Sequence, residues 1–248
     1  MKYPKNNLNE VIFHIKFSPL SKLCANENDA IAEFQKKVEK EFPNIEFEKK
    51  RKPKYNADRT GKLGEDRNEK HSTWILSNEN KQIQISGREL RMIHDGEIYD
   101  GFDDFMGDVN LIVNELDEYD LTNVEFIGLR YINQFKIRNE DQIDEYFNPS
   151  LHLKKEEFSK NEFVESLTKT DLIIGNYDLI LTYGRFNPDY PNRTSKKDVI
   201  LDYDCINQYD EEPDYISVNL KKMHRIIESR FENDIKDRLR EEMGWKND

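Results

Sequence analysis

The stretch Val124–Ile137, VEFIGLRYINQFKI, is the longest apolar run with a strand-forming composition, and it lies near the middle of the 248-residue chain. Side chains alternate between two faces along a strand, and both faces of this run are largely apolar. A strand that is covered on both faces has such a pattern. We therefore predict a central buried strand around which the other elements pack.

Two polar residues, Arg130 and Asn133, interrupt this run. A buried guanidinium needs an anion, and a buried amide needs hydrogen-bond partners. One interpretation is a ligand-binding region in which Arg130 meets an anionic ligand, with Tyr131 and Asn133 alongside. Strict alternation directs Arg130 away from those two residues unless a bulge at Gly128 turns them together. The other interpretation, which is favoured, is an internal ion pair and a satisfied core amide.

A second polar pair lies on the predicted strand Asp198–Asn207, where Asp202 and Asp204 share one face. Same-face carboxylates lie about 7 Å apart along a strand, so they can hold a divalent cation, pair with arginine or face water. Arg130 and Arg185 are strand-borne candidates for such pairing. Ion pairing is favoured because charged residues are almost never buried without a partner. No metal site and no cofactor is predicted.

In the first 140 residues the sequence pattern predicts five features in order along the chain. They are a strand at Val11–Phe17, a helix that begins near Asp29, strands within Thr73–His94, a helix at Asp103–Glu118 and the central strand. Apolar residues recur every second position in the strands and every third or fourth in the helices. With antiparallel strands and both helices on one face, this order predicts an α+β fold of ferredoxin-like arrangement.

Residues 141–248 predict a second α+β half, which is a degraded version of the first, and we expect both halves to form one compact unit. Its predicted elements are a short strand at Leu151–Leu153, a helix at Glu157–Leu167, long strands at Leu172–Phe186 and Asp198–Asn207, and a long helix at Asn219–Met243 capped by Asn219.

The segment from Lys49 to Ser72 carries almost no apolar side chain and is predicted to be a long mobile loop. Its beginning holds the one basic cluster of the chain, formed by Lys49, Lys50, Arg51, Lys52 and Lys54. One hypothesis is an arm that contacts nucleic acid or phosphate. The other, which the acidic and neutral residues that follow favour, is a solvated loop.

The composition, 36% hydrophobic and 35% charged with a net charge of −12, indicates an ordered body with long charged surface segments. The charge argues against broad binding to DNA or anionic membranes. No apolar run approaches the ~20 residues of a membrane span. Cys24 and Cys205 form neither a disulfide framework nor a zinc site, which suits a reducing cytosol. We expect a cytoplasmic protein without a membrane partner.

Catalytic motifs are missing from the sequence: it has no Gly-x-Ser-x-Gly, no phosphate-binding Gly-x-x-x-x-Gly-Lys and no His-Glu-x-x-His. The five histidines are scattered, and His224 is predicted to be a surface residue of the last helix. We therefore expect a protein without catalytic activity.

Three segments together resemble a sporadically distributed, uncharacterised family of prokaryotic proteins of about this length. They are Tyr3-Pro4 followed by LNEVI at 8–12, GLRYIN at 128–133 and the closing helix from His224 to Phe231. The resemblance would cover nearly the whole chain. It implies no known activity and no catalytic residues, and the patchy distribution implies at most mobile or defence-associated genes.

Three functional hypotheses follow. The leading one is a non-catalytic cytoplasmic binding or accessory protein whose partner is another protein, within a defence or mobile-element system. The second is RNA binding or RNA processing through the basic cluster. The third is a metal-dependent phosphoryl-transfer enzyme that uses Asp202 and Asp204.

Overall fold

One antiparallel sheet of nine strands organises the described part of the chain. The structure is a computed structural model, and it describes residues 3–22, 27–51, 55–57, 63–65, 70–139, 141–153, 165–192, 198–208 and 212–245. At positions 27, 49–51, 55–57, 63–65 and 70–72 it describes the backbone alone. Within these ranges, no helix combines the length and the apolar character that crossing a membrane requires.

The strands of the large sheet lie in the order β2-β5-β6-β7-β1-β8-β11-β10-β9, and each neighbouring pair is antiparallel. Their bounds are β1 Leu8–Phe17, β2 Asn44–Arg51, β5 Lys70–Ser77, β6 Lys81–Ile85, β7 Glu89–Asp95, β8 Val124–Phe135, β9 Ser166–Ile174, β10 Tyr177–Phe186 and β11 Asp198–Asn207. A separate two-stranded sheet joins β3, Tyr55–Ala57, to β4, Leu63–Glu65. The prediction of an α+β protein with antiparallel sheets is confirmed.

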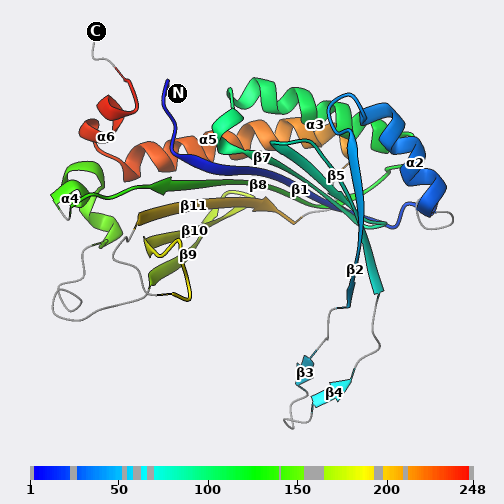
Figure 1. Ribbon diagram of the computed structural model, residues 1–248, viewed down its shortest axis with the longest axis horizontal. Coiled ribbons are helices and arrows are strands. Elements are labelled where there is room, and N and C mark those ends of the chain that lie inside the picture. The colour runs from blue at the N-terminus through cyan, green and yellow to red at the C-terminus, as the bar shows by residue number, and fades with distance from the viewer. Residues whose placement is uncertain are drawn as a thin grey trace.

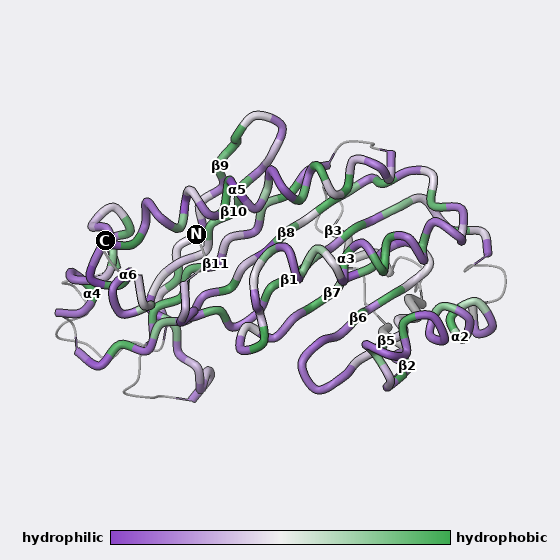
Figure 2. Tube along the Cα trace, turned by 90° about the horizontal axis from the view of Figure 1, so that it is seen from above, coloured by the Kyte–Doolittle hydropathy of each residue, from purple (hydrophilic) through white to green (hydrophobic). Residues whose placement is uncertain are grey.

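Helices cover one face of the large sheet (Figure 1). Their bounds are α2 Glu27–Val38, α3 Phe102–Asp117, α4 Asp141–Tyr146, α5 Ile216–Asp234 and α6 Asp237–Glu242, with short 3-10 turns η1 Gly96–Ile98, η2 Pro149–Leu151 and η4 Pro213–Tyr215. Figure 2 looks down on this layer and shows the strands running obliquely beneath α3 and α5. The opposite face of the central strands, here named the open face, has no helix over it in the described part of the chain.

The hydrophobic core lies between the sheet and the helices. Every second residue of β1 from Val11 to Phe17 is at most 1% exposed, as the period of a strand requires. Helix α3 contributes a buried stripe with the three- and four-residue spacing of an amphipathic helix. The stripe consists of Phe105, Val109, Ile112 and Leu116, which belong to the same buried cluster as the β1 residues.

Residues 1–140 and 141–248 meet strand to strand in the middle of this sheet. β8 pairs with β1 on one side and with β11 on the other. Leu129 of β8 lies opposite Phe13 and Cys205, and all three side chains are fully buried. In the later residues, β9, β10 and β11 form a meander that precedes α5. This meander differs from the degraded ferredoxin-like half that the sequence predicts.

The prediction of a loop from Lys49 to Ser72 is wrong at both ends of that segment. β2 continues to Arg51 and pairs with β5, which begins at Lys70. Figure 1 shows these two strands projecting from the body of the sheet toward β3 and β4. A strand pair satisfies its backbone groups whatever its side chains are, so polar composition does not reveal it.

The prediction of a single strand at Leu172–Phe186 is also wrong, because this run forms a hairpin. β9 ends at Ile174 and β10 begins at Tyr177. Gly175 between them has a φ of 61°, the conformation that the first central residue of a type II′ turn requires. The chain therefore reverses inside a run whose composition is strand-like throughout.

Among the short elements predicted for the later residues, one is wrong and another is contradicted at its end. Leu151 ends a 3-10 turn and does not begin a strand, and His152 is left-handed with a φ of 47°. Of the predicted helix Glu157–Leu167, residues 157–164 lie outside the described residues, and Ser166 and Leu167 belong to β9.

The predicted helix Asn219–Met243 is two helices. Ile235 and Lys236 have extended backbone and separate α5 from α6. Asn219 is not the cap that the sequence predicts, because it is buried inside α5. There its Oδ1 accepts a hydrogen bond of 2.6 Å from the Tyr177 hydroxyl.

Candidate functional site

The candidate residues Arg130, Tyr131 and Asn133 lie on two different faces of β8. Residues from Gly128 to Ile132 pair with β11 without a register shift, so alternation is strict there. Tyr131 and Asn133 lie under the helices, and each is 6% exposed. The Arg130 side chain lies on the open face and is 41% exposed. The three residues therefore do not share a site, and β8 is not covered on both faces as predicted.

On the open face, Arg130 and Asp202 form the ion pair that was one interpretation of the sequence. Nε and Nη2 of Arg130 donate to the two carboxylate oxygens of Asp202 at 2.7 and 2.6 Å, which is the bidentate geometry that arginine favours. Asp202 is buried, so this contact supplies the compensation that a buried carboxylate needs. Asp204 lies opposite Arg130 in the register, and burial raises the pKa of its carboxyl group.

Arg185 was a second candidate partner for these aspartates. It is a buried residue of β10 that lies opposite Val199, on the other face of the sheet from Asp202. Within the described residues, no group of three or more His, Cys, Asp or Glu side chains is placed to hold a metal ion. The open face thus presents a paired arginine and aspartate, with Asp204 beside them.

The basic cluster falls on the arm formed by β2 and β5. Lys49, Lys50 and Arg51 continue β2, and their backbone pairs with β5 at positions 70–72. Their side chains, and the whole of Lys52 and Lys54, lie outside what the structure describes. The nucleic-acid hypothesis for this cluster stays a prediction.

A pocket of about 880 Å³ lies over β8 on the helix side of the sheet, and it includes Tyr131 and Asn133. Its walls come from the start of α3, from α5 and from the residues that precede and begin β1. Rings line much of it: Tyr3, Tyr99, Phe102, Tyr131, His224 and Phe231. These rings come from segments far apart in sequence, so folding alone brings them together.

Tyr131 stands at the centre of a chain of polar contacts in this pocket. Its hydroxyl oxygen lies 2.8 Å from that of Tyr99 and 3.1 Å from Nδ1 of His224. A hydroxyl has one donor and two acceptor lone pairs, so it can satisfy both neighbours at once. The imidazole of His224 stacks on the ring of Phe102, with centroids 4.1 Å apart and an interplanar angle of 2°. His224 therefore fixes α5 against the start of α3.

Burial holds this cluster in its uncharged form. It raises the pKa of Tyr131 well above the ordinary tyrosine value and raises that of Tyr99 to about 12. It also lowers the pKa of His224 to about 4, because a charged imidazole is disfavoured away from water. At neutral pH the cluster offers hydrogen bonds and ring faces but no charge.

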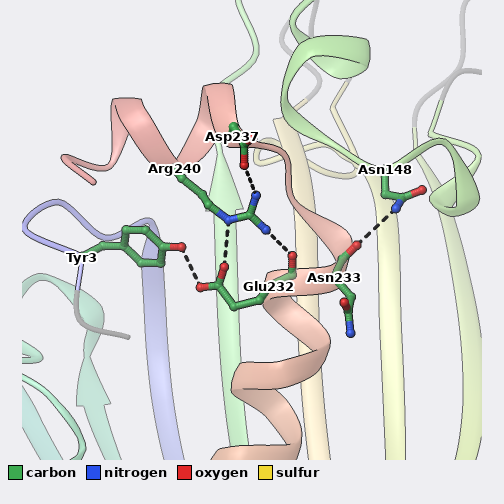
Figure 3. A network of polar contacts seen from close by, with 6 residues as sticks. All are labelled: Tyr3, Asn148, Glu232, Asn233, Asp237 and Arg240. Atoms are coloured by element: carbon green, nitrogen blue, oxygen red, sulfur yellow. Dashed lines mark hydrogen bonds and ion pairs between the residues drawn. The ribbon is translucent and has the colours of Figure 1, made fainter. Parts of the chain in front are cut away.

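A second polar network closes the pocket near the end of α5 (Figure 3). The Tyr3 hydroxyl donates to Oε1 of Glu232 at 2.6 Å, and Nε of Arg240 donates to Oε2 of the same carboxylate at 2.8 Å. Arg240 also donates to Asp237 at 2.6 Å, in the first turn of α6. This guanidinium links α5 to α6, and Tyr3 ties the residues before β1 to both.

Acidic residues outnumber basic residues along the pocket lining. The acids are Asp100, Asp103, Asp104, Glu228 and Glu232, and the bases are Lys221 and Arg225. Arg240, which is not part of the lining, forms an ion pair with Glu232 and shares its guanidinium with Asp237. Asp103 and Asp104 are solvent-exposed in the first turn of α3. The pocket therefore combines uncharged aromatic walls with carboxylates along its lining.

Sequence reasoning found Tyr131 and Asn133 but missed the rest of this pocket. His224 was predicted to be a surface residue, whereas it is partly buried and in contact with Phe102 and Tyr131. One signal was present: His224 is four residues after Leu220 and three before Ile227, which places it at the edge of the buried stripe of α5.

We expect the protein to lose stability as the pH falls from about 6.5 toward 4, partly through His224. Its pKa is lower in the folded than in the unfolded chain, so the unfolded chain binds the extra proton first. The stabilising contribution is complete above pH 6.5 and is lost toward pH 4. It amounts to roughly 1–2 kcal/mol once the solvent exposure of the ring is allowed for.

Urea titrations of the wild-type and His224→Gln chains at several pH values measure this effect. The other titrating groups are common to both chains, so the wild type should show the steeper decrease in unfolding free energy. Parallel curves would mean that His224 does not titrate with folding.

Comparison of the sequence with protein-family models and with curated proteins found no match to either.

Proposed function

We propose that the protein is a non-catalytic cytoplasmic binding protein whose pocket takes an organic cation, presented as a basic side chain by a partner protein. The observation that carries this proposal is the uncharged Tyr99–Tyr131–His224 cluster inside a pocket with an excess of carboxylates. No catalytic motif competes with this interpretation.

The pKa values of the cluster favour binding over proton transfer. A general acid or base works best when its pKa lies near the working pH. The pKa of His224 is about 4 and that of Tyr99 is about 12, so neither group exchanges protons readily at neutral pH. Their fixed hydrogen bonds and ring stacking instead give the pocket a preformed shape, which lowers the entropic cost of binding.

The lining favours a cation for two reasons. Aromatic faces attract ammonium and guanidinium groups, by about 0.5–2 kcal/mol depending on solvent exposure. Asp103 and Asp104 lie at the start of α3 beside Phe102, so a cation that stacks on this ring is also within the field of the carboxylates. An anionic ligand would meet the same field with the opposite sign.

Isothermal titration calorimetry with agmatine and spermidine tests this proposal. We expect both cations to bind and citrate not to bind. Phe102→Ala removes the ring that stacks on His224, so it should weaken agmatine binding roughly tenfold, the upper part of the cation–π range. His14→Ala is the matched control, because His14 lies on the open face at the register position of Gly128. It should bind agmatine as the wild type does.

Equal binding of citrate and agmatine would contradict the assignment of a cation site. Turnover of a substrate that is abolished by Tyr131→Phe would contradict a non-catalytic role.

A further inference from the structure

The outer strand β9 has one edge with no strand partner in the described part of the chain. It is the last strand of the nine, and it pairs with β10 alone. A free strand edge presents unpaired N–H and C=O groups and is a template for another strand. β9 is nine residues long and contains no proline, so each of its residues keeps the backbone N–H that strand pairing uses.

The hairpin geometry shows which residues of β9 direct their backbone outward. Ile174 and Tyr177 flank the two-residue turn and form its closing hydrogen-bonded pair. Bonded and non-bonded positions alternate along an antiparallel pair, so every second residue back from Ile174 bonds to β10. The outward-directed residues are those between them: Leu167, Lys169, Asp171 and Ile173.

The side chains at these outward positions are unusually apolar for an exposed edge. Ile173 is 84% exposed and Leu167 is 42% exposed. Lys169 and Asp171 lie between them and form a loose ion pair at 3.6 Å within the strand. The edge therefore has an apolar residue at each end and two opposite charges in the middle.

This pattern is self-complementary about Thr170. When two copies of β9 run antiparallel with Thr170 on the two-fold axis, Lys169 lies opposite Asp171 of the second copy. In the same register, Leu167 lies opposite Ile173 of the second copy. These four residues are also the ones whose backbone groups point outward. In this register the backbone hydrogen bonds, the opposite-charge pairs and the apolar pairs therefore form at the same positions.

Moving the two-fold axis by one residue in either direction removes this pairing of opposite charges. An axis at Asp171 would place two aspartates opposite each other, and an axis at Lys169 would do the same for two lysines. Like charges at directly opposite positions destabilise a strand pair. Of these three axes, only the one at Thr170 places opposite charges across from each other.

We propose that the protein forms a two-fold symmetric dimer by antiparallel pairing of β9 with β9 of a second copy, centred on Thr170. The two nine-stranded sheets then form one continuous sheet, and the exposed Ile173 and Leu167 cover each other. Such a contact is isologous and closes after two copies, so it does not propagate into a fibre. The pocket lies over β8, which is three strands away from β9 in the sheet.

Analytical ultracentrifugation of the full chain over a range of concentrations tests the dimer. We expect the mass to approach twice the 29.7 kDa of the chain as concentration rises. Lys169→Glu places a carboxylate opposite Asp171 and should weaken the dimer roughly tenfold. Asp171→Lys should do the same by opposing Lys169. The double variant with both changes restores opposite charges across the axis, and its dissociation constant should return toward that of the wild type.

A cysteine at the axis gives a second measurement. At a non-hydrogen-bonded antiparallel pair the Cα atoms lie about 4.5 Å apart, within the range of a disulfide. Oxidised Thr170→Cys should therefore form a covalent dimer, whereas Thr168→Cys, which faces Leu172 of the second copy, should not. A monomer at all concentrations together with no Thr170→Cys cross-link would overturn the proposal. So would a dimer that is insensitive to both single charge changes.

Discussion

Replacing Leu129 by alanine should lower the free energy of unfolding by roughly 3–5 kcal/mol, the usual cost of a large-to-small change in a closed core. Leu129 lies opposite Phe13 of β1 and Cys205 of β11, and none of the three is accessible to water. The neighbouring strands are fixed by their own hydrogen bonds, so the site cannot collapse to fill the space. Chemical denaturation followed by circular dichroism measures the loss.

Ile132→Ala is the matched control, because Ile132 lies on the same strand but faces the open side and is only partly buried. It should cost roughly 1–2 kcal/mol, since less apolar area leaves contact with the protein. Equal losses for the two variants would show that both faces of β8 are closed to the same degree, contrary to the arrangement in Figure 1.

Replacing Gly96 by alanine should destabilise the protein by about 2–3 kcal/mol, as expected for overpacking that the backbone must absorb. A Cβ atom at this buried position would lie 2.1 Å from the carbonyl oxygen of Leu8. The turn η1 or the start of β1 must therefore move. Leu8 and Tyr99 both line the pocket, so we also expect weaker agmatine binding by calorimetry.

Gly107→Ala separates this clash from the general effect of replacing a glycine. A Cβ at Gly107 would meet nothing within 4 Å, and the residue is inside α3. Alanine is favoured over glycine in a helix by up to about 1 kcal/mol, so this variant should be slightly more stable and should bind normally. A stable Gly96→Ala chain with unchanged binding would mean that η1 and β1 can separate without cost.

Much of the sheet was predictable because its strands follow the two-residue period. The alternation from Val11 to Phe17 and the run at Val124–Ile137 both correspond to observed strands. The stripe of α3 likewise follows from its three- and four-residue spacing. Errors occurred where the backbone changes direction without a change in composition, as at Gly175, where a two-residue turn lies inside one β-rich run.

The break after α5 was missed for a related reason. Ile235 keeps the apolar spacing of a helix, yet its backbone is extended and it bridges to Phe147. Tertiary contacts of this kind override local propensity. They involve residues far apart in the chain, which a periodicity within one segment cannot reveal.

The pocket was predictable only in part. Asn133 was a candidate as a polar residue within a predicted buried strand, and Tyr131 was a candidate as its neighbour; both line the pocket. Tyr99, Phe102 and His224 carried no motif, because stacking and hydrogen bonding between separate elements have no fixed spacing in sequence.

The pairing of Arg130 was expected from the cost of an unpaired buried charge, whereas its exposure on the open face was not. The resemblance to a prokaryotic family stays a prediction.

The position of β1 has a consequence for how the chain assembles. β1 lies between β7 and β8, although it precedes them by roughly eighty and a hundred and twenty residues. During synthesis this apolar strand cannot pair until both of its neighbours have left the ribosome. Closing such long loops also slows folding. Among the described strands, β1 therefore stays without its partners for the longest part of synthesis, and during that time its apolar side chains are exposed to misassociation.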